Sequence, residues 1–321
     1  MARASHGGTR RHVTDATKVV GGGFSGLARA ARLVRDGHAV EYVEPTLHAG
    51  GFMRTESFLT PFRFNLGPSV VLRDIVGSAR AIEPDPLISV AGSSLGRDPV
   101  VLAPVGTAVE TLAASRCDGG ERSALLGLAL LGGIDPEGGG SGRELAWLAR
   151  RLPSLVALAD GNGLVTARLV DEIVANGGRV SEGLGRKPRR RGYAGRLGTS
   201  RLFIGLRDAP PTTPAFATAI GWDDESELLS SLDRLRKGEL ISPVGLLLRN
   251  THLDPPGGGL GSCVWQGILP ADTALDRKAH TESVLRAIGI DADRVLFALL
   301  WLPNETSELL GARSYLRGVR V

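Results

Sequence analysis

The first recognisable pattern in the chain is a short strand, a glycine-rich turn and an amphipathic helix. Residues 16–20 are predicted to form the strand. Ala30, Leu33 and Val34 then recur at helical spacing. Residues 38–44 form a second short β-type run. This order predicts a βαβ unit with two parallel strands.

A second helix and strand pair is predicted in the middle of the chain. Residues 165–176 place their apolar side chains on one helical face, and a strand is expected at 177–180. Further helices are expected over 106–114, 122–131, 145–159 and 223–235, and further sheet segments over 84–90, 98–102 and 244–249.

The glycine turn has the spacing G-x-G-x-x-G in Gly21, Gly23 and Gly26. In this pattern the first glycine allows a tight turn, the second lets backbone approach a pyrophosphate, and the third lets helix and strand pack closely. Glu44 follows Gly26 by 18 positions, near the ~20-residue offset of an acid that binds ribose hydroxyls. A plain glycine-rich turn is the alternative for the glycines alone, and Glu44 favours dinucleotide binding. The expected cradle consists of Gly21, Gly22, Gly23, Phe24, Ser25, Gly26 and Glu44.

Composition narrows the function classes. The 321 residues are 42% hydrophobic and 22% charged, which suits one or two globular domains with a sizeable core. The formal net charge is +4, and one dense basic run at 186–191 could contact nucleic acid or an anionic membrane. A solvated loop is the favoured interpretation, because no aromatic residues are interleaved there to stack on bases. We therefore expect no nucleic-acid partner.

The cysteines, histidines and apolar stretches indicate whether a metal site, a secretory signal or a membrane span is to be expected. Cys117 and Cys263 have no C-x-x-C partner, and the six histidines are scattered, so no metal site is expected. Residues 1–15 are polar and lack the apolar region of a secretory signal, so we expect a disordered lead-in. The apolar stretches at 124–134 and 295–302 are shorter than the about 20 residues of a membrane span. A cytoplasmic protein is expected, with peripheral membrane contact as a further option.

Two motifs beyond Glu44 carry a family resemblance. They are the doublet Gly50-Gly51 and the stretch Phe62-Arg63-Phe64-Asn65-Leu66-Gly67-Pro68-Ser69. Together with the glycine turn they resemble the flavoproteins with two dinucleotide-binding domains, and in particular the phytoene desaturase-like proteins. The resemblance implies an α/β fold with a Rossmann-like FAD-binding domain and an interleaved α+β substrate domain. It assigns residues 16–75 and 141–200 to the first domain, and 76–140 and 201–321 to the second.

The same resemblance implies the cofactor contacts. In that family the glycine doublet lets backbone run beside the flavin diphosphate, and an arginine usually follows it. Here Phe52 stands in that place and Arg54 comes two residues later, while Asn65 replaces the usual aspartate. The residues implied to bind FAD, in addition to the cradle, are Gly50, Gly51, Arg54, Gly67, Pro68 and Ser69.

The function implied by the resemblance is that of an FAD-dependent oxidoreductase. The flavin would take a hydride from an activated C–H of an apolar, isoprenoid or carotenoid-like substrate, as in carotenoid biosynthesis. No residue is assigned as a general base, and His252 is expected to be structural.

Two alternatives stay open: an NAD(P)-linked dehydrogenase, and a non-catalytic protein of the same fold that binds a lipid or a protein partner. Polar Thr17 and Lys18 in the first strand motivate the second alternative. The sequence ending at Val321 also motivates it, because the desaturases continue for well over a hundred residues and the C-terminal flavin segment is expected to be missing.

Overall fold

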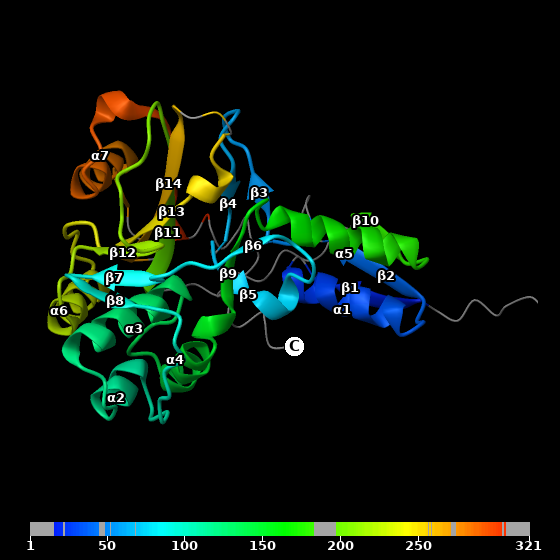
Figure 1. The fold of residues 1–321 in the computed structure, drawn as a ribbon, viewed down its shortest axis with the longest axis horizontal. Helices are drawn as coiled ribbons and strands as arrows, with labels where there is room; N and C mark the ends of the chain where they lie inside the picture. Colours follow the sequence, from blue (N-terminus) through cyan, green and yellow to red (C-terminus); the bar gives the residue numbers. More distant parts are fainter. Residues whose placement is uncertain are drawn as a thin grey trace, which may run out of the picture.

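The computed structural model describes residues 16–21, 23–44, 49–51, 53–67, 69–182, 197–255, 257, 259–270, 274–303 and 305. They form two parts, and the chain passes from one part to the other more than once. A small parallel sheet with two helices lies at one end of the molecule, and a large mixed sheet covered by helices lies at the other (Figure 1).

The smaller part is a parallel sheet with the strand order β1-β2-β10. Its elements are β1 (Thr17–Val20), α1 (Phe24–Arg35), β2 (Val40–Glu44), α5 (Gly163–Ala175) and β10 (Arg179–Glu182). Helices α1 and α5 contact each other and share one buried cluster, in which Leu27 and Ile173 meet Tyr42 of the sheet. The predicted βαβ unit and the predicted helix and strand pair in mid-chain are confirmed.

The larger part is built on a seven-stranded sheet with the order β15-β11-β14-β13-β12-β7-β8. All neighbouring strands are antiparallel except β7 and β12. The strands are β7 (Ile88–Val90), β8 (Ser93–Leu95), β11 (Leu197–Leu206), β12 (Ala217–Ile220), β13 (Gly245–Arg249), β14 (Gly261–Pro270) and β15 (Val295–Trp301).

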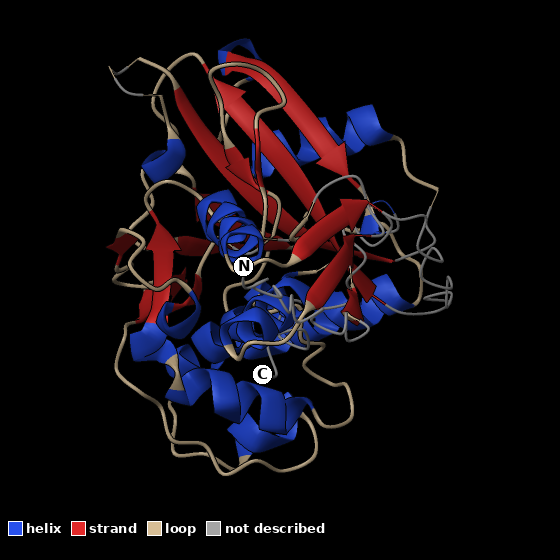
Figure 2. Ribbon diagram, turned by 90° about the vertical axis from the view of Figure 1, so that its right-hand side faces the viewer, coloured by secondary structure: helices blue, strands red, loops and turns tan. Residues whose placement is uncertain are grey.

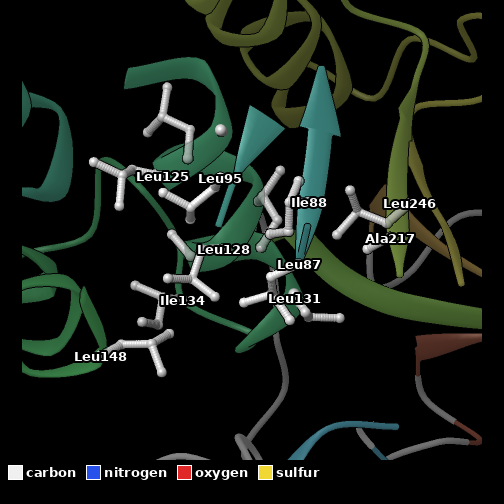
Figure 3. Close-up of a cluster of buried hydrophobic side chains, with 14 of the residues drawn as sticks. Leu87, Ile88, Leu95, Leu125, Leu128, Leu131, Ile134, Leu148, Ala217 and Leu246 are labelled. Carbon is white, nitrogen blue, oxygen red and sulfur yellow. The ribbon is translucent and has the colours of Figure 1, made fainter. Parts of the chain in front are cut away.

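Helices cover both faces of this sheet. The helices are α2 (Ala108–Ala113), α3 (Gly119–Leu131), α4 (Ser141–Arg150), α6 (Glu225–Arg236) and α7 (Arg277–Ala287). Figure 3 shows Leu125 and Leu128 of α3 in the main buried cluster, with Ile88 and Leu246 of the sheet. Helix α7 packs on the opposite face, where Trp265 belongs to a second cluster. Helix α3 is buried on all sides from Ser123 to Leu131, and the sheet is a hydrophobic layer between the helices.

Short antiparallel pieces connect the two parts. They are β3 (Thr55–Glu56) with β4 (Phe64–Asn65), and the sheet of β5 (Val71–Leu72), β9 (Leu155–Leu158) and β6 (Ala81–Ile82). Single 3₁₀ turns lie at η1 (Arg73–Ile75), η2 (Leu152–Ser154), η3 (Thr251–Leu253) and η4 (Ala292–Arg294). Figure 2 shows the long strands of the larger sheet in red, with helices beside them.

Two predictions about local structure are wrong. The stretch 145–159 is not one helix, because α4 ends at Arg150 and β9 begins at Leu155. Pro153 lies between them, and its missing N–H does not allow a helix to continue. No strand forms at 98–102; instead β8 pairs with β7 through a tight turn in which Ala91 and Gly92 both have positive φ.

The predicted domain limits stay a prediction. Both stretches assigned to the dinucleotide-binding domain supply strands to the parallel sheet. Helix α4, within the second of these stretches, contacts α2 and α3 of the larger part. The expected lead-in at 1–15 and the basic run at 186–191 lie outside the described residues.

Candidate functional site

The glycine turn joins β1 to α1 at the end of the parallel sheet. The Gly21 N–H donates to Val43 O at 3.3 Å, which ties the turn to β2. A Cβ on Gly26 would lie 3.3 Å from Gly21 O, so the turn and the helix touch backbone to backbone. A Cβ on Gly23 would meet no atom of the described residues within 4 Å. Packing within the protein therefore favours glycine at the third position, whereas the second leaves an open backbone surface.

Helix α1 presents an uncompensated positive end at this turn. It begins at Phe24, its N-cap Gly23 makes no side-chain cap, and its first turn contains no acidic residue. Its last turn contains Arg32 and Arg35, whose positive charges are stabilised by the negative end of the helix dipole. Phe24 is buried and Ser25 is half-buried. A helix end of this kind attracts phosphate groups.

Glu44 ends β2 beside the turn, and Tyr42 holds it there. Glu44 is 2% exposed, and the Tyr42 hydroxyl donates to its Oε2 at 2.8 Å. The same hydroxyl contacts the Gly21 carbonyl oxygen. Burial, and then the hydrogen bond and charge of Glu44, raise the pKa of Tyr42 far above its ordinary value, so the phenol keeps its proton. One buried hydroxyl therefore links the acid of β2 to the first glycine.

The glycine doublet is pressed against α5. Gly50 and Gly51 have φ of 99° and 53°, a conformation that favours glycine. A Cβ on Gly50 would lie 2.5 Å from the Thr166 side chain, and Thr166 Oγ1 donates to Met53 O at 2.6 Å. The doublet therefore lets this loop follow the first turn of α5 closely.

Arg54 follows this loop and is a cation beside the cradle. Its side chain is 14% exposed, and its Nε lies 3.6 Å from Glu56 Oε1. Burial lowers the pKa of Arg54, opposed by the charges of Glu56 and Glu44. Its Nε is buried without a hydrogen-bond partner. The structure thus brings Arg54 into the electrostatic range of Glu44.

The stretch from Asn65 to Ser69 contains three residues whose polar groups are buried or hydrogen-bonded to distant parts of the chain. Asn65 is fully buried, and its Oδ1 accepts from Thr55 Oγ1 at 2.8 Å and from the Asn162 N–H at 2.9 Å. Gly67 O accepts from Arg201 of β11 at 2.9 Å. The Ser69 hydroxyl is buried and has no partner. Gly22 and Pro68, also expected in the site, lie outside the described residues.

Two residues near the site were not predicted from the sequence: Tyr42 and Arg201. Each carries a sequence signal. Tyr42 is a polar-tipped residue two positions before Glu44, and therefore on the same face of the strand. Arg201 is a charged residue at the start of the apolar run Leu202–Leu206, where a strand would bury it.

A second polar cluster lies at η3 and the start of β14. Asn250 Nδ2 donates to Ser262 Oγ at 2.5 Å and to Arg63 O at 2.9 Å, and Ser262 Oγ donates to Asp254. His252 Nε2 is buried without a partner. Within the described ranges, no group of three or more His, Cys, Asp or Glu side chains is arranged to hold a metal ion.

Comparisons with known proteins define the class of fold. Residues 19–78 match the sequence model of the NAD(P)-binding Rossmann-like domain. No curated protein sequence matches the chain.

Solved structures of similar fold cover most of the chain at low identity. The PF1083 protein of Pyrococcus furiosus aligns over 88% of this chain and 87% of its own, with 14% identity and a TM-score of 0.55. An oxidoreductase of Methanosarcina mazei covers 93% and 90%, with 13% identity and a TM-score of 0.55. A reduced UDP-galactopyranose mutase covers 91% and 82%, with 12% identity and a TM-score of 0.55. The predicted fold class, a Rossmann-like domain combined with a mixed α/β sheet domain, is confirmed.

None of the described helices has both the length and the apolar character that crossing a membrane requires.

Proposed function

We propose that the chain is an FAD-dependent oxidoreductase. The observation that carries the proposal is the turn from Gly21 to Gly26, which delivers the free end of α1 beside a buried Glu44. The similarity in fold to an oxidoreductase and to a mutase solved in a reduced state supports the redox class.

The residues present fit the adenosine diphosphate part of FAD. The open backbone at Gly23 and the first turn of α1 would receive the diphosphate. Glu44 would accept hydrogen bonds from the ribose hydroxyls. The Arg54 Nε makes no hydrogen bond, although Glu56 Oε1 lies 3.6 Å away, and a diphosphate oxygen would supply the acceptor. Gly67 would contribute backbone, and Ser69 a hydroxyl, to the binding of FAD.

The doublet Gly50-Gly51 and the stretch from Phe64 to Ser69 favour FAD over free NAD(P), since a nicotinamide Rossmann domain does not need them. When bound, FAD would supply the acceptor for a hydride from a C–H bond. The chain would hold the cofactor and keep water from the reacting carbon. An apolar, isoprenoid-like substrate is supported by a cluster of rings, in which the centroids of Phe58, Phe203 and Trp301 lie 5.1–5.6 Å from one another.

Flavin uptake tests the proposal directly. The purified protein, mixed with FAD and desalted, should retain flavin absorbance. Gly23→Ala should lower the free energy of unfolding by no more than about 1 kcal/mol, because the added methyl meets no atom of the described residues and alanine is only a poorer N-cap than glycine. The same methyl should weaken FAD binding about 10- to 100-fold, the usual effect of an extra methyl at a close contact. Gly139→Ala is the matched control, because its added Cβ also meets no atom within 4 Å in the described part of the chain and it lies outside the cradle.

Two results would contradict the proposal. A protein that stays colourless with added FAD, yet is stabilised by NAD(H), would be an NAD(P)-linked enzyme. A colourless protein that responds to neither nucleotide would favour the non-catalytic alternative, a lipid- or partner-binding protein of this fold.

A further inference from the structure

Arg201 is a buried cation whose hydrogen-bond acceptors are both neutral. It is 3% exposed, and its guanidinium donates to Gly67 O at 2.9 Å and to Gln266 Oε1 at 2.8 Å. Among the described residues no aspartate or glutamate forms an ion pair with it. Burial is the sole cause that lowers the pKa of Arg201, to about 10, so the group stays charged at neutral pH. The site therefore contains one positive charge without an anion.

Gln266 fixes the position of this guanidinium. Its Nε2 donates to the carbonyls of Leu130 and Leu131, at 3.0 and 3.3 Å, where α3 ends. The amide oxygen is thereby turned toward Arg201. The carbonyl end of α3 provides partial negative charge, which is weaker than a carboxylate. The arginine is thus held in place, and its charge is only partly compensated.

Aromatic side chains share the sheet face with Arg201. Trp301 pairs with Arg201 across β11 and β15, and Phe203 is two residues along the same strand, so all three side chains lie on one face. Phe203 and Trp301 pack at 5.1 Å between ring centroids. Phe58 and Phe297 complete this aromatic strip, and they are half-buried like Trp301. The strip thus lies along β15, an edge strand of the sheet, with the cation at one end.

A buried charge without its counter-charge is unfavourable, and an apolar residue of similar size would pack there at lower cost. The missing partner of Arg201 is therefore an acceptor that carries negative charge.

We propose that Arg201 anchors the anionic group of the substrate, and that the substrate is an apolar carboxylate whose body lies along Phe58, Phe297 and Trp301. A carboxylate is favoured because one guanidinium neutralises one negative charge and binds its two oxygens in a planar fork. That the ligand is the substrate of a redox reaction rests on the proposed function. The carboxylate site itself rests on Arg201.

Calorimetric titration of the FAD-loaded protein with 4-phenylbutyrate and its neutral amide tests this assignment. The wild type should bind the carboxylate about 10- to 100-fold more tightly than the amide, the range expected for a hydrogen bond to a charged group. Arg201→Gln should abolish this preference and leave the affinity for the amide unchanged. Arg249→Gln should keep the preference, because Arg249 pairs with Cys263 on the opposite face and donates to Thr213.

Arg201→Lys keeps the positive charge but loses the planar pair of N–H donors, so it should retain part of the preference for the carboxylate. This variant replaces Arg201→Gln in the test if the glutamine variant does not fold. Equal affinity of the wild type for carboxylate and amide would overturn the assignment, as would an Arg201→Gln protein that still prefers the carboxylate. Flavin absorbance of the same sample is recorded first. If FAD does not bind, the proposed function fails, and the titration of that sample still decides whether Arg201 binds a carboxylate.

Discussion

The Tyr42 hydroxyl links the end of β2 to the glycine turn, since it donates to Glu44 Oε2 at 2.8 Å and contacts the Gly21 carbonyl. The side chains of Tyr42 and Glu44 are almost fully buried. This geometry fixes the carboxylate relative to the glycine turn before any ligand arrives.

Tyr42→Phe should lower the free energy of unfolding by about 1–3 kcal/mol, because it removes a buried hydrogen bond to a charged group. Chemical denaturation measures this change. The variant should also bind ADP more weakly while binding 2′,3′-dideoxy-ADP as the wild type does, because only the ribose hydroxyls need an oriented Glu44. Glu44→Gln should show the same pattern. An equal loss for both nucleotides would mean that Tyr42 acts only through general stability.

Arg54→Gln should weaken ADP and FAD binding about tenfold and leave adenosine binding unchanged, because the lost charge would face the diphosphate. Fluorescence or calorimetric titration with the three ligands separates these effects. Glu56→Gln is the control, since it removes the 3.6 Å partner of Arg54 and keeps the cation. ADP binding should be unchanged or tighter in that variant. A tenfold loss for adenosine in Arg54→Gln would assign the arginine to the nucleoside instead.

Asp254 and His252 should have opposite effects on stability between about pH 4 and pH 6. Burial raises the pKa of Asp254 from 3.8 to about 6, so the folded protein holds a proton that the unfolded chain loses, and stability falls as pH rises. Burial, and then the charge of Arg63, lower the pKa of His252 from 6.5 to about 4. The unfolded chain therefore binds the extra proton, and this contribution to stability rises with pH.

The two contributions should be separable by measuring the free energy of unfolding against pH. The stability of Asp254→Asn relative to wild type should increase from pH 4 to pH 6. That of His252→Gln should decrease over the same window. Each slope should stay below about 1.4 kcal/mol per pH unit, the limit for one proton. Differences that do not change with pH would show that neither group titrates in this window.

Gly267→Ala should destabilise the larger sheet by about 1–3 kcal/mol, because the added methyl would overlap the ring of buried Trp265. Tryptophan fluorescence during thermal unfolding reports both the loss of stability and any displacement of the ring. Gly119→Ala should change stability by less than about 0.5 kcal/mol, since its added Cβ meets no atom within 4 Å among the residues that the structure describes. Equal melting temperatures for the two variants would contradict this packing.

Local patterns in the sequence determined the elements that depend on near neighbours. The glycine turn, the helix after it and the acid at the end of β2 all follow from spacing within residues 16–44, and the fold confirms this βαβ unit. The same approach failed over 145–159, because a run of leucine, valine and alanine suits a buried helix and a buried strand equally. Pro153 interrupts the helix, and β9 forms as a strand because it pairs with β5 and β6.

Contacts between distant residues were decided by the tertiary structure alone. No spacing rule brings Arg201 to the carbonyl of Gly67, or the Asn65 side chain to the Asn162 N–H at the start of α5. These contacts depend on how β11 packs beside β4 and how α5 returns to α1, and such packing depends on the whole core at once. The sequence therefore predicted where a dinucleotide could be held. The tertiary structure alone placed a buried, unpaired cation beside the stretch assigned to the cofactor.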